Sequence, residues 1–119
     1  MNRFFLQGIN DVAISRQAQI LEEDRAYEGK ERPTPTGGHA VAGACYGLAA
    51  MFQMNGDMEG GREVPSFWPG QPEEWTPSED PRENLIRAIC FMLAEVDAID
   101  RTKLIEVPEK PSIILSSTG

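Results

Sequence analysis

Several polar and aromatic side chains are of types that bind ligands or protein partners. The guanidinium group of arginine pairs with phosphates and carboxylates, and tyrosine and tryptophan stack on bases or fill hydrophobic pockets. These residues do not form a catalytic motif, so they predict a binding site and not a catalytic one. The candidate binding residues are Arg16, Gln17, His39, Tyr46, Trp68, Trp75, Arg82 and Glu95.

Arg16 interrupts the apolar stripe of a predicted helix, because it lies four residues after Val12 and four before Ile20. A guanidinium group on an inner face is costly unless it is paired. Arg16 therefore either forms a structural salt bridge with a carboxylate of another helix, or lines a pocket and meets an anion. Gln17 lies at the edge of the same stripe.

His39 is the single histidine of the chain and stands at the start of a predicted helix. Free N–H groups and the positive end of the helix dipole disfavour the imidazolium form there, so we expect a neutral ring near pH 7. The ring is either a capping or core residue or a part of the binding site.

The two tryptophans, Trp68 and Trp75, lie in the proline-rich stretch "SFWPGQPEEWTPSEDPRENL", residues 66–85. Prolines lower the entropy lost when such a segment is held in one conformation. We expect this segment to fold back over one end of the helices. The tryptophans then either cover a thin core or form the wall of a ligand pocket or a contact point for a partner.

Metal, cofactor and nucleophile signals are weak. Cys45 and Cys90 each sit within an apolar helical pattern, which favours small buried residues over a disulfide or a metal pair. The segment "TGGH" lacks the Lys-Ser/Thr that a phosphate-binding loop needs. We therefore expect neither a metal nor a cofactor.

Three helices must position these residues, and their apolar periodicity predicts them at about residues 5–27, 39–52 and 80–103. The predicted fold is an all-α, compact three-helix core with long Pro/Gly-rich connections. It divides into one helical domain, residues 1–104, and an extended tail, residues 105–119. The predicted buried stripes are Ile9, Val12, Ala13, Ile20 and Leu21 in the first helix, and Leu85, Ile89, Met92, Val96 and Ile99 in the last.

Composition narrows the choice of partners. The 119 residues include 11 Lys and Arg against 19 Asp and Glu, which gives a net charge of −8. An acidic chain without a basic run disfavours direct nucleic-acid binding. It suits a basic protein surface, although the charge also serves solubility alone. The longest apolar run, residues 40–54, is too short to span a bilayer, and no signal peptide is evident, so we expect a cytoplasmic protein without a membrane partner.

The order of several motifs resembles that of a group of small, uncharacterised, all-helical proteins of tailed phages and prophages. The similarity covers about residues 9–101. The chain differs from the group at two places. Before the histidine, "KERPTPTGG" replaces an acidic and aromatic stretch, and Gly70 stands where a second aromatic residue is usual. The resemblance implies a phage or mobile-element origin, hence the host cytoplasm, and no particular activity. The motifs that carry it are Arg16-Gln17, His39, Ala44-Cys45-Tyr46, Trp68-Pro69, Trp75, Pro77, Asp80-Pro81-Arg82, Ala94-Glu95-Val96 and Asp100-Arg101.

Three functions follow as hypotheses. The first is a non-enzymatic binding protein that inhibits a host (defence) factor by protein–protein contact or sequesters a small nucleotide. In the sequestering version, Arg16 and Arg82 meet phosphates and an aromatic residue stacks on the base.

The second hypothesis is a magnesium-dependent all-α nucleoside triphosphate pyrophosphohydrolase, with Glu22, Glu23, Glu95, Asp97 and Asp100 as the available carboxylates. The third is a structural or assembly accessory protein. In it, Gly43 and Gly47, four residues apart on one helix, form the contact face of a homodimer.

Overall fold

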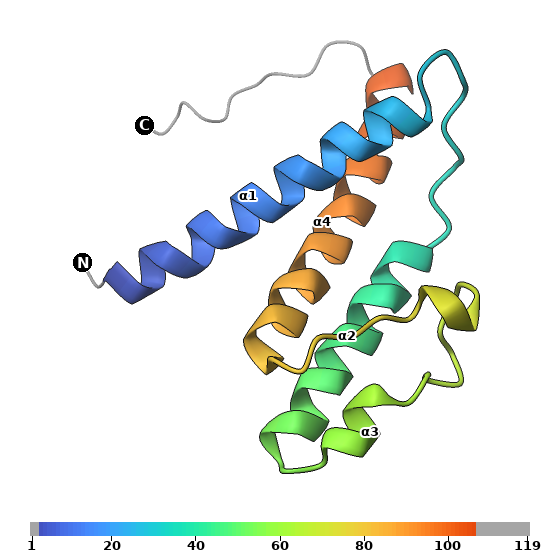
Figure 1. The fold of residues 1–119 in the computed structure, drawn as a ribbon. Coiled ribbons are helices and arrows are strands. Elements are labelled where there is room, and N and C mark those ends of the chain that lie inside the picture. Colours follow the sequence, from blue (N-terminus) through green and yellow to red (C-terminus); the bar gives the residue numbers. More distant parts are fainter. Residues whose placement is uncertain (1–2, 107–119) are drawn as a thin grey trace.

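The computed structural model describes residues 3–106, apart from the side chains at the two ends of that range, and it is all-α (Figure 1). The described residues form four α-helices, one 3-10 helix and no strand, which confirms the predicted fold class. The elements are α1 (Arg3–Ala26), α2 (Gly38–Met54), α3 (Met58–Arg62), the 3-10 helix η1 (Pro72–Glu74) and α4 (Pro81–Glu106). The short α3 and η1 were not predicted, and α4 continues through the first two residues of the predicted tail. The rest of that tail lies outside the described residues.

Local sequence signals explain where the helices begin and end. Gly37 precedes α2 with a φ of 90°, a conformation that residues with a β-carbon rarely adopt. Asp80 accepts a hydrogen bond from the backbone N–H of Arg82 at 3.0 Å, so it caps α4 as its sequence position indicates. Asp57 caps α3 in the same way, through the N–H of Gly60 at 2.8 Å.

The helices α2 and α4 run antiparallel, side by side, and form the centre of the molecule (Figure 1). Their backbones approach closely at Gly43, where an added β-carbon would lie 2.8 Å from the carbonyl oxygen of Ala88. Gly43 therefore packs inside one chain, whereas the space beside Gly47 is open. The prediction that both glycines share a homodimer face is wrong for Gly43, because α4 of the same chain already occupies its side.

The segment between α3 and α4 folds back over this helix pair and completes the core. The ring of Trp75 lies 4.6 Å from that of Tyr46, and Trp68 and Phe91 complete the aromatic cluster at 5.9 and 5.6 Å from Tyr46. Trp75 is only 7% exposed, and its indole N–H donates to the carbonyl of Arg62 at 2.9 Å. Trp75 thus has the covering role that the sequence suggested.

A buried amide pair anchors the same segment at its other end. The side-chain NH₂ group of Asn84 donates to Gln53 Oε1 and to the carbonyl of Ser78, each at 2.9 Å. The amide of Gln53 donates to the same carbonyl at 2.8 Å, and the N–H of Ser78 donates to Asn84 Oδ1 at 2.9 Å. Because both amides are paired, their burial is tolerated and fixes the path of the segment before α4.

The first helix crosses α4, and its N-terminal end extends beyond the other helices (Figure 1). The predicted buried stripe of α1 is wrong in most positions. Ile9, Ala13, Ile20 and Leu21 are exposed, and only Val12 is partly buried.

The predicted buried stripe of α4 is also wrong. Its five large apolar residues, Leu85 to Ile99, are each between 39% and 50% exposed. The buried residues of α4 are instead small or polar, and at Ala88 the small side chain allows the close approach of α2. These buried residues are Asn84, Ala88, Cys90, Ala94, Glu95 and Ala98. None of the helices described here is both long and apolar enough to cross a membrane.

Candidate binding cleft

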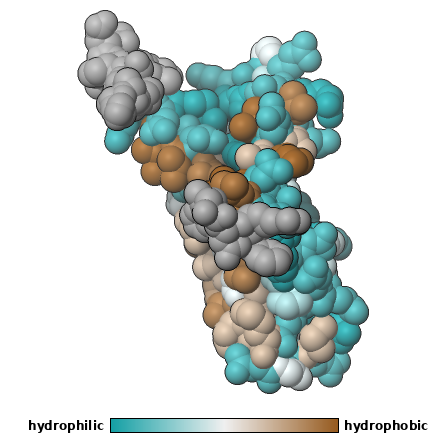
Figure 2. All heavy atoms as spheres, turned by 90° about the vertical axis from the view of Figure 1, so that its left-hand side faces the viewer, coloured by the Kyte–Doolittle hydropathy of each residue, from teal (hydrophilic) through white to brown (hydrophobic). Residues whose placement is uncertain are grey.

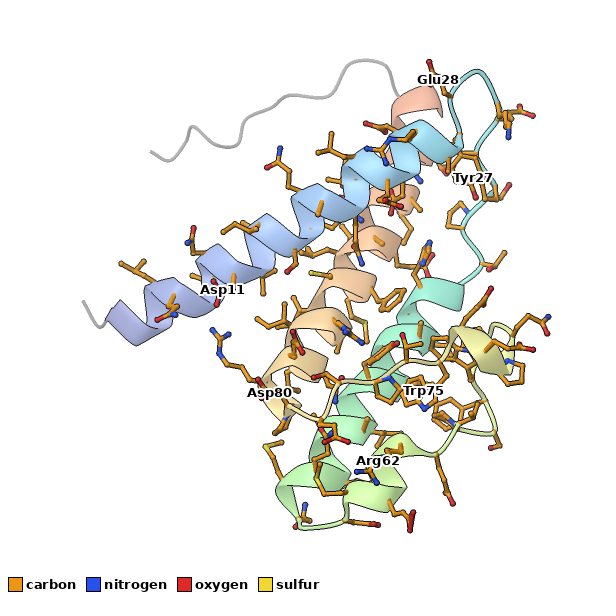
Figure 3. All side chains as sticks on the ribbon, viewed as in Figure 1. Asp11, Tyr27, Glu28, Arg62, Trp75 and Asp80 are labelled. Carbon is orange, nitrogen blue, oxygen red and sulfur yellow. The ribbon has the colours of Figure 1, made fainter. Side chains whose placement is uncertain are left out.

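A cleft of about 550 Å³ lies where the start of α2, the C-terminal half of α4, the loop before α2 and the segment around Trp68 meet. Its walls combine aromatic rings with charged side chains, as binding pockets commonly do. Tyr27, at the end of α1, borders it from above (Figure 3). The side chains that matter most for its chemistry are those of Glu23, Tyr27, Arg32, His39, Trp68, Glu74, Phe91, Glu95 and Arg101.

The carboxylate of Glu95 links the two central helices at the cleft. Glu95 Oε1 accepts a hydrogen bond from the backbone N–H of Ala40 at 3.0 Å. Because Gly37 offers no side-chain cap, this carboxylate from α4 satisfies the free N-terminus of α2 and its positive dipole. Glu95 is 8% exposed and lines the cleft, so its carboxylate contributes a negative charge there.

Aromatic rings line the cleft together with this carboxylate. The ring of His39 stacks on that of Phe91, with centroids 6.2 Å apart and an angle of 26° between the planes. Trp68 lies edge-on to Tyr46, and its indole N–H donates to the carbonyl of Gln71 at 2.9 Å. One face of the cleft is thus apolar and held in place by the aromatic core behind it.

The charged groups of the cleft are slightly more acidic than basic. Glu23, Glu74 and Glu95 contribute three carboxylates against the guanidinium groups of Arg32 and Arg101. Arg32 is already paired with Asp24 at 2.6 Å and lies over the ring of Tyr27 at 5.5 Å. Within the part of the chain that is described, Arg101 has no ion pair. The cleft therefore offers little net attraction to an anion.

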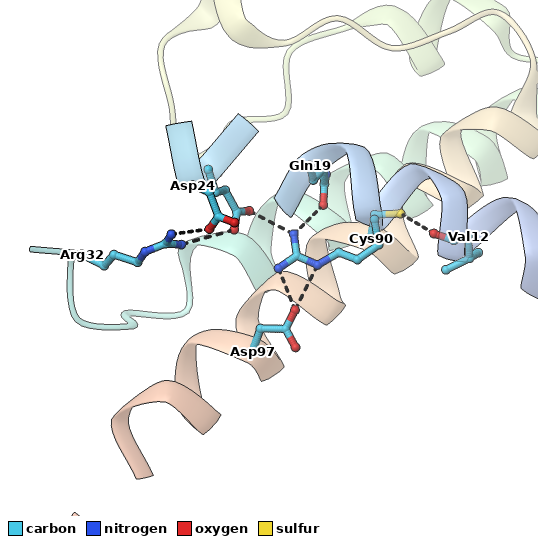
Figure 4. A network of polar contacts seen from close by, with 8 residues as sticks. Val12, Gln19, Asp24, Arg32, Cys90 and Asp97 are labelled. Carbon is cyan, nitrogen blue, oxygen red and sulfur yellow. Dashed lines mark hydrogen bonds and ion pairs between the residues drawn. The ribbon is translucent and has the colours of Figure 1, made fainter. Parts of the chain in front are cut away.

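Arg16 lies outside the cleft, in a polar network between α1 and α4 (Figure 4). Its guanidinium donates twice to Asp97 Oδ2, at 3.0 and 2.7 Å, and to Glu23 and Gln19 at 2.9 Å each. Burial by itself lowers the pKa of Arg16, but its hydrogen bonds to Glu23 and Asp97 outweigh burial and raise the pKa. Of the two roles that the sequence left open for Arg16, the structure therefore shows the structural salt bridge.

The predicted site residues fall into three groups: those that line the cleft, those in the aromatic core, and those that lie elsewhere. His39, Trp68 and Glu95 line the cleft, whereas Tyr46 and Trp75 form the aromatic core next to it. Arg82, at the start of α4, pairs with Asp11 at 2.9 Å, away from the cleft. Gln17 is exposed on α1. Arg16 belongs to the α1–α4 network described above.

Sequence reasoning missed several cleft residues, chiefly Tyr27, Arg32, Phe91 and Arg101. Phe91 could have been found, because it precedes Glu95 by four residues and so shares its face of α4. The others depend on the path of the loop between α1 and α2, which the sequence does not determine.

The carboxylates needed for a metal-dependent hydrolase do not gather. Among the described residues no group of three or more His, Cys, Asp or Glu side chains could hold a metal ion. Glu23 and Asp97 are held by Arg16, and the exposed Glu22 pairs with Arg25 at 3.4 Å. The geometry therefore gives the pyrophosphohydrolase hypothesis no support.

The two cysteines are free and buried, as the sequence predicted. Burial raises the pKa of the Cys45 thiol. Burial also raises the pKa of the Cys90 thiol, against a smaller opposing effect of Arg16. A neutral, buried thiol is a poor nucleophile, so both cysteines act as small core residues.

Comparison with known proteins found no matching protein-family model, no matching curated protein and no matching solved structure. The resemblance to small phage proteins stays a prediction from the sequence.

Proposed function

We propose that the protein is a non-enzymatic binding protein whose cleft receives a basic side chain of a partner protein. The carboxylate of Glu95, which lines the cleft together with aromatic rings, supports this function most strongly. A lysine or arginine that reaches Glu95 would form a charge-assisted hydrogen bond in a partly desolvated site, where such bonds are strongest.

The aromatic walls favour the same kind of ligand. Trp68 lines the cleft and presents a ring on which an alkyl stem or a guanidinium group can pack, and a cation is attracted to a ring face. Tryptophan, tyrosine and arginine are also the residues that contribute most to protein–protein binding. The net charge of −8 would steer a basic surface toward the protein.

Sequestration of a nucleotide has less support. The two arginines that were expected to meet phosphates, Arg16 and Arg82, do not line the cleft, and each is paired with a carboxylate. The carboxylates of the cleft would repel phosphates, and Glu95 already occupies the N-terminus of α2, where an anion would otherwise bind.

The partner that we propose is a host protein, given the resemblance to phage proteins. Occupying a basic surface of that protein would block its own ligand, and this is the route by which a small acidic protein would inhibit a host defence factor. Neither step requires an enzymatic reaction.

Binding can be tested by the fluorescence of Trp68 with a short arginine-containing peptide and the same peptide with citrulline in place of arginine. We expect a saturable, salt-sensitive change with the arginine peptide alone. In Glu95→Gln the neutral amide still accepts the N–H of Ala40, but the affinity falls about tenfold, because a hydrogen bond to a charged group contributes roughly 1.5–3 kcal/mol.

Glu83→Gln is the matched control, since Glu83 is an exposed carboxylate of α4 that does not line the cleft. It should bind the arginine peptide as the wild type does. Equal affinities of the wild type and Glu95→Gln would refute the role of Glu95. A response to nucleotides but not to the peptide would favour sequestration instead.

A further inference from the structure

The outward side of the α2–α4 pair carries large apolar side chains that the described chain covers only in part. We call this surface the outer face. Each of its residues is between 37% and 50% exposed. They are Val41, Leu48, Met51 and Phe52 on α2, and Leu85, Ile89, Met92, Val96 and Ile99 on α4.

The composition of α2 shows that its outward side is not built for water. None of its 17 residues is acidic, lysine or arginine. Two of its polar side chains, Tyr46 and Gln53, are buried, and the ring of His39 stacks on Phe91 at the cleft. A helix that is apolar on every side is normally covered on every side.

The spacing on α4 is that of a helix–helix seam. Its five outer residues follow one another at intervals of four, three, four and three, an average of 3.5 residues. This period keeps one stripe aligned with a partner helix and is characteristic of knobs-into-holes packing. On α2, Val41, Ala44, Leu48 and Met51 repeat at intervals of three, four and three. Both helices therefore present a seam.

The two seams form one continuous surface. Met92 of the α4 seam reaches α2, because its Cγ and Cε would each lie 3.2 Å from a β-carbon at Gly43. Figure 2 shows apolar side chains gathered down one side of the face in view, with hydrophilic side chains on the other side. Large contiguous apolar patches of this kind mark interaction sites on proteins.

We propose that a second copy of this chain covers the outer face, so that two α2–α4 pairs form a four-helix bundle. A two-fold interface must be self-complementary, and a surface of apolar seams with no charge at its centre meets that requirement. Two chains of net charge −8 repel each other at long range, and an uncharged surface adds no repulsion of its own to the contact.

The chemistry of the surrounding residues favours a second copy over a membrane. Helices that lie on membranes have lysine and arginine along their polar side, whereas α2 has neither and the chain as a whole is acidic. The α4 seam is about 21 Å long at 1.5 Å per residue and lies beside that of α2. A stable interface buries about 800 Å² per partner, so the contact requires the seams of both helices.

The outer face and the cleft are separate on α4. The cleft uses Phe91, Glu95 and Ala98, and the outer face uses the residues that alternate with them around the helix. Dimer formation and peptide binding can therefore fail independently. A monomer that still binds the arginine peptide would reject the dimer alone.

Sedimentation equilibrium of the full chain at micromolar concentrations tests the proposal. We expect the wild type to have twice the mass of one 13.2 kDa chain. The double variant Ile89→Glu with Val96→Glu should be monomeric and, by circular dichroism, still helical, because both positions are already exposed in one chain. Ile14→Glu, at a 62% exposed position of α1 outside the outer face, should remain dimeric.

A monomeric wild type overturns the proposal. Another protein or the segment 107–119 would then be the candidate to cover the outer face. A dimer that survives the double variant also overturns it, because the contact would then lie elsewhere. If the double variant unfolds, a spin label at Val96→Cys replaces it, since Cys45 and Cys90 are buried. The proposal requires dipolar broadening at this position and none with the label at Ile14→Cys.

Discussion

The inner and outer sides of the α2–α4 pair use opposite kinds of residues. The inner side joins the helices through alanine, glycine, cysteine and a buried amide pair, and the outer side carries valine, leucine, isoleucine, methionine and phenylalanine. In a self-sufficient domain the large aliphatic residues are the buried ones. One chain thus uses close backbone contact for its own fold, and its large side chains are the ones that we propose for association.

This division leaves the core of a single chain thin. Alanine and glycine bury little apolar surface, so most of the bulk comes from the aromatic cluster, to which the segment between α3 and α4 contributes Trp68 and Trp75. The stability of one chain should therefore depend strongly on a few aromatic residues and weakly on the large residues outside.

The largest effect is expected for Trp75→Ala. Trp75 fills the space beside Tyr46 and is 7% exposed, so its removal should lower the free energy of unfolding by about 3–5 kcal/mol. Urea unfolding at one fixed protein concentration measures this loss. Phe67→Ala, at a 49% exposed position of the same segment, should cost about 0.5 kcal/mol or less. Similar losses for the two variants would contradict a core built on the aromatic cluster.

A matched pair of glycine substitutions compares the closely packed inner side at Gly43 with the open space beside Gly47. At Gly43 a methyl group would meet the backbone of Ala88, so Gly43→Ala should destabilise the fold by about 1–3 kcal/mol. At Gly47 the space is open, and Gly47→Ala should stabilise α2 by up to about 1 kcal/mol. Thermal unfolding followed by circular dichroism compares them. The same sign for both changes would mean that the helices do not approach closely at Gly43.

The α1–α4 contact is polar and should be weaker than the aromatic core. Arg16→Met leaves Glu23 and Asp97 without their guanidinium partner, and we expect a loss of about 1–2 kcal/mol, because both carboxylates remain partly exposed. Urea unfolding measures it. Arg25→Met removes an exposed pair with Glu22 and should change stability by less than about 0.5 kcal/mol. A neutral Arg16→Met would show that α1 is held in another way.

The smallest effect concerns the thiols at neutral pH. Because burial raises the pKa of Cys45 and Cys90, both stay protonated in the folded chain, and Ellman's reagent should react only as fast as the chain opens. The buried thiols contribute their full stabilisation of the folded chain below the ordinary thiol pKa. This stabilisation falls as the pH rises above that value, because only the unfolded chain then releases its thiol protons. Rapid labelling at pH 7 would show that the inner side is open.

The positions of the main helices could be predicted because residues that cap or exclude helices mark their ends. Gly37 and Asp80 stand directly before α2 and α4, and Pro33 and Pro35 exclude a helix between α1 and α2. The short α3 has too few residues for an apolar period, so its capping Asp57 alone was not enough to reveal it.

The direction of the apolar stripes could not be predicted, although the stripes themselves could. A period of 3.5 residues places Leu85 to Ile99 on one side of α4, but it does not say whether that side meets the same chain or another one. The side that meets α2 is marked by Ala88, Ala94 and Ala98, whose small size allows the helices to approach. Small residues in a helix were therefore the better guide to contacts inside the chain.

His39 and Glu95 were both candidate site residues and both line the cleft. The hydrogen bond from the N–H of Ala40 to Glu95, at a helix start without a side-chain cap, was not predicted. Arg16 and Arg82 were assigned to phosphates for their charge, and sequence spacing could not show that Asp97 and Asp11 already pair with them.

The dependence of the unfolding temperature on protein concentration tests most directly whether the large outer residues serve association. Since the folded dimer is favoured by mass action, the unfolding temperature of the wild type should rise with concentration. That of the variant with Ile89→Glu and Val96→Glu should stay constant. A wild-type unfolding temperature that is independent of concentration would contradict the account, because the outer face would then be exposed in the working protein.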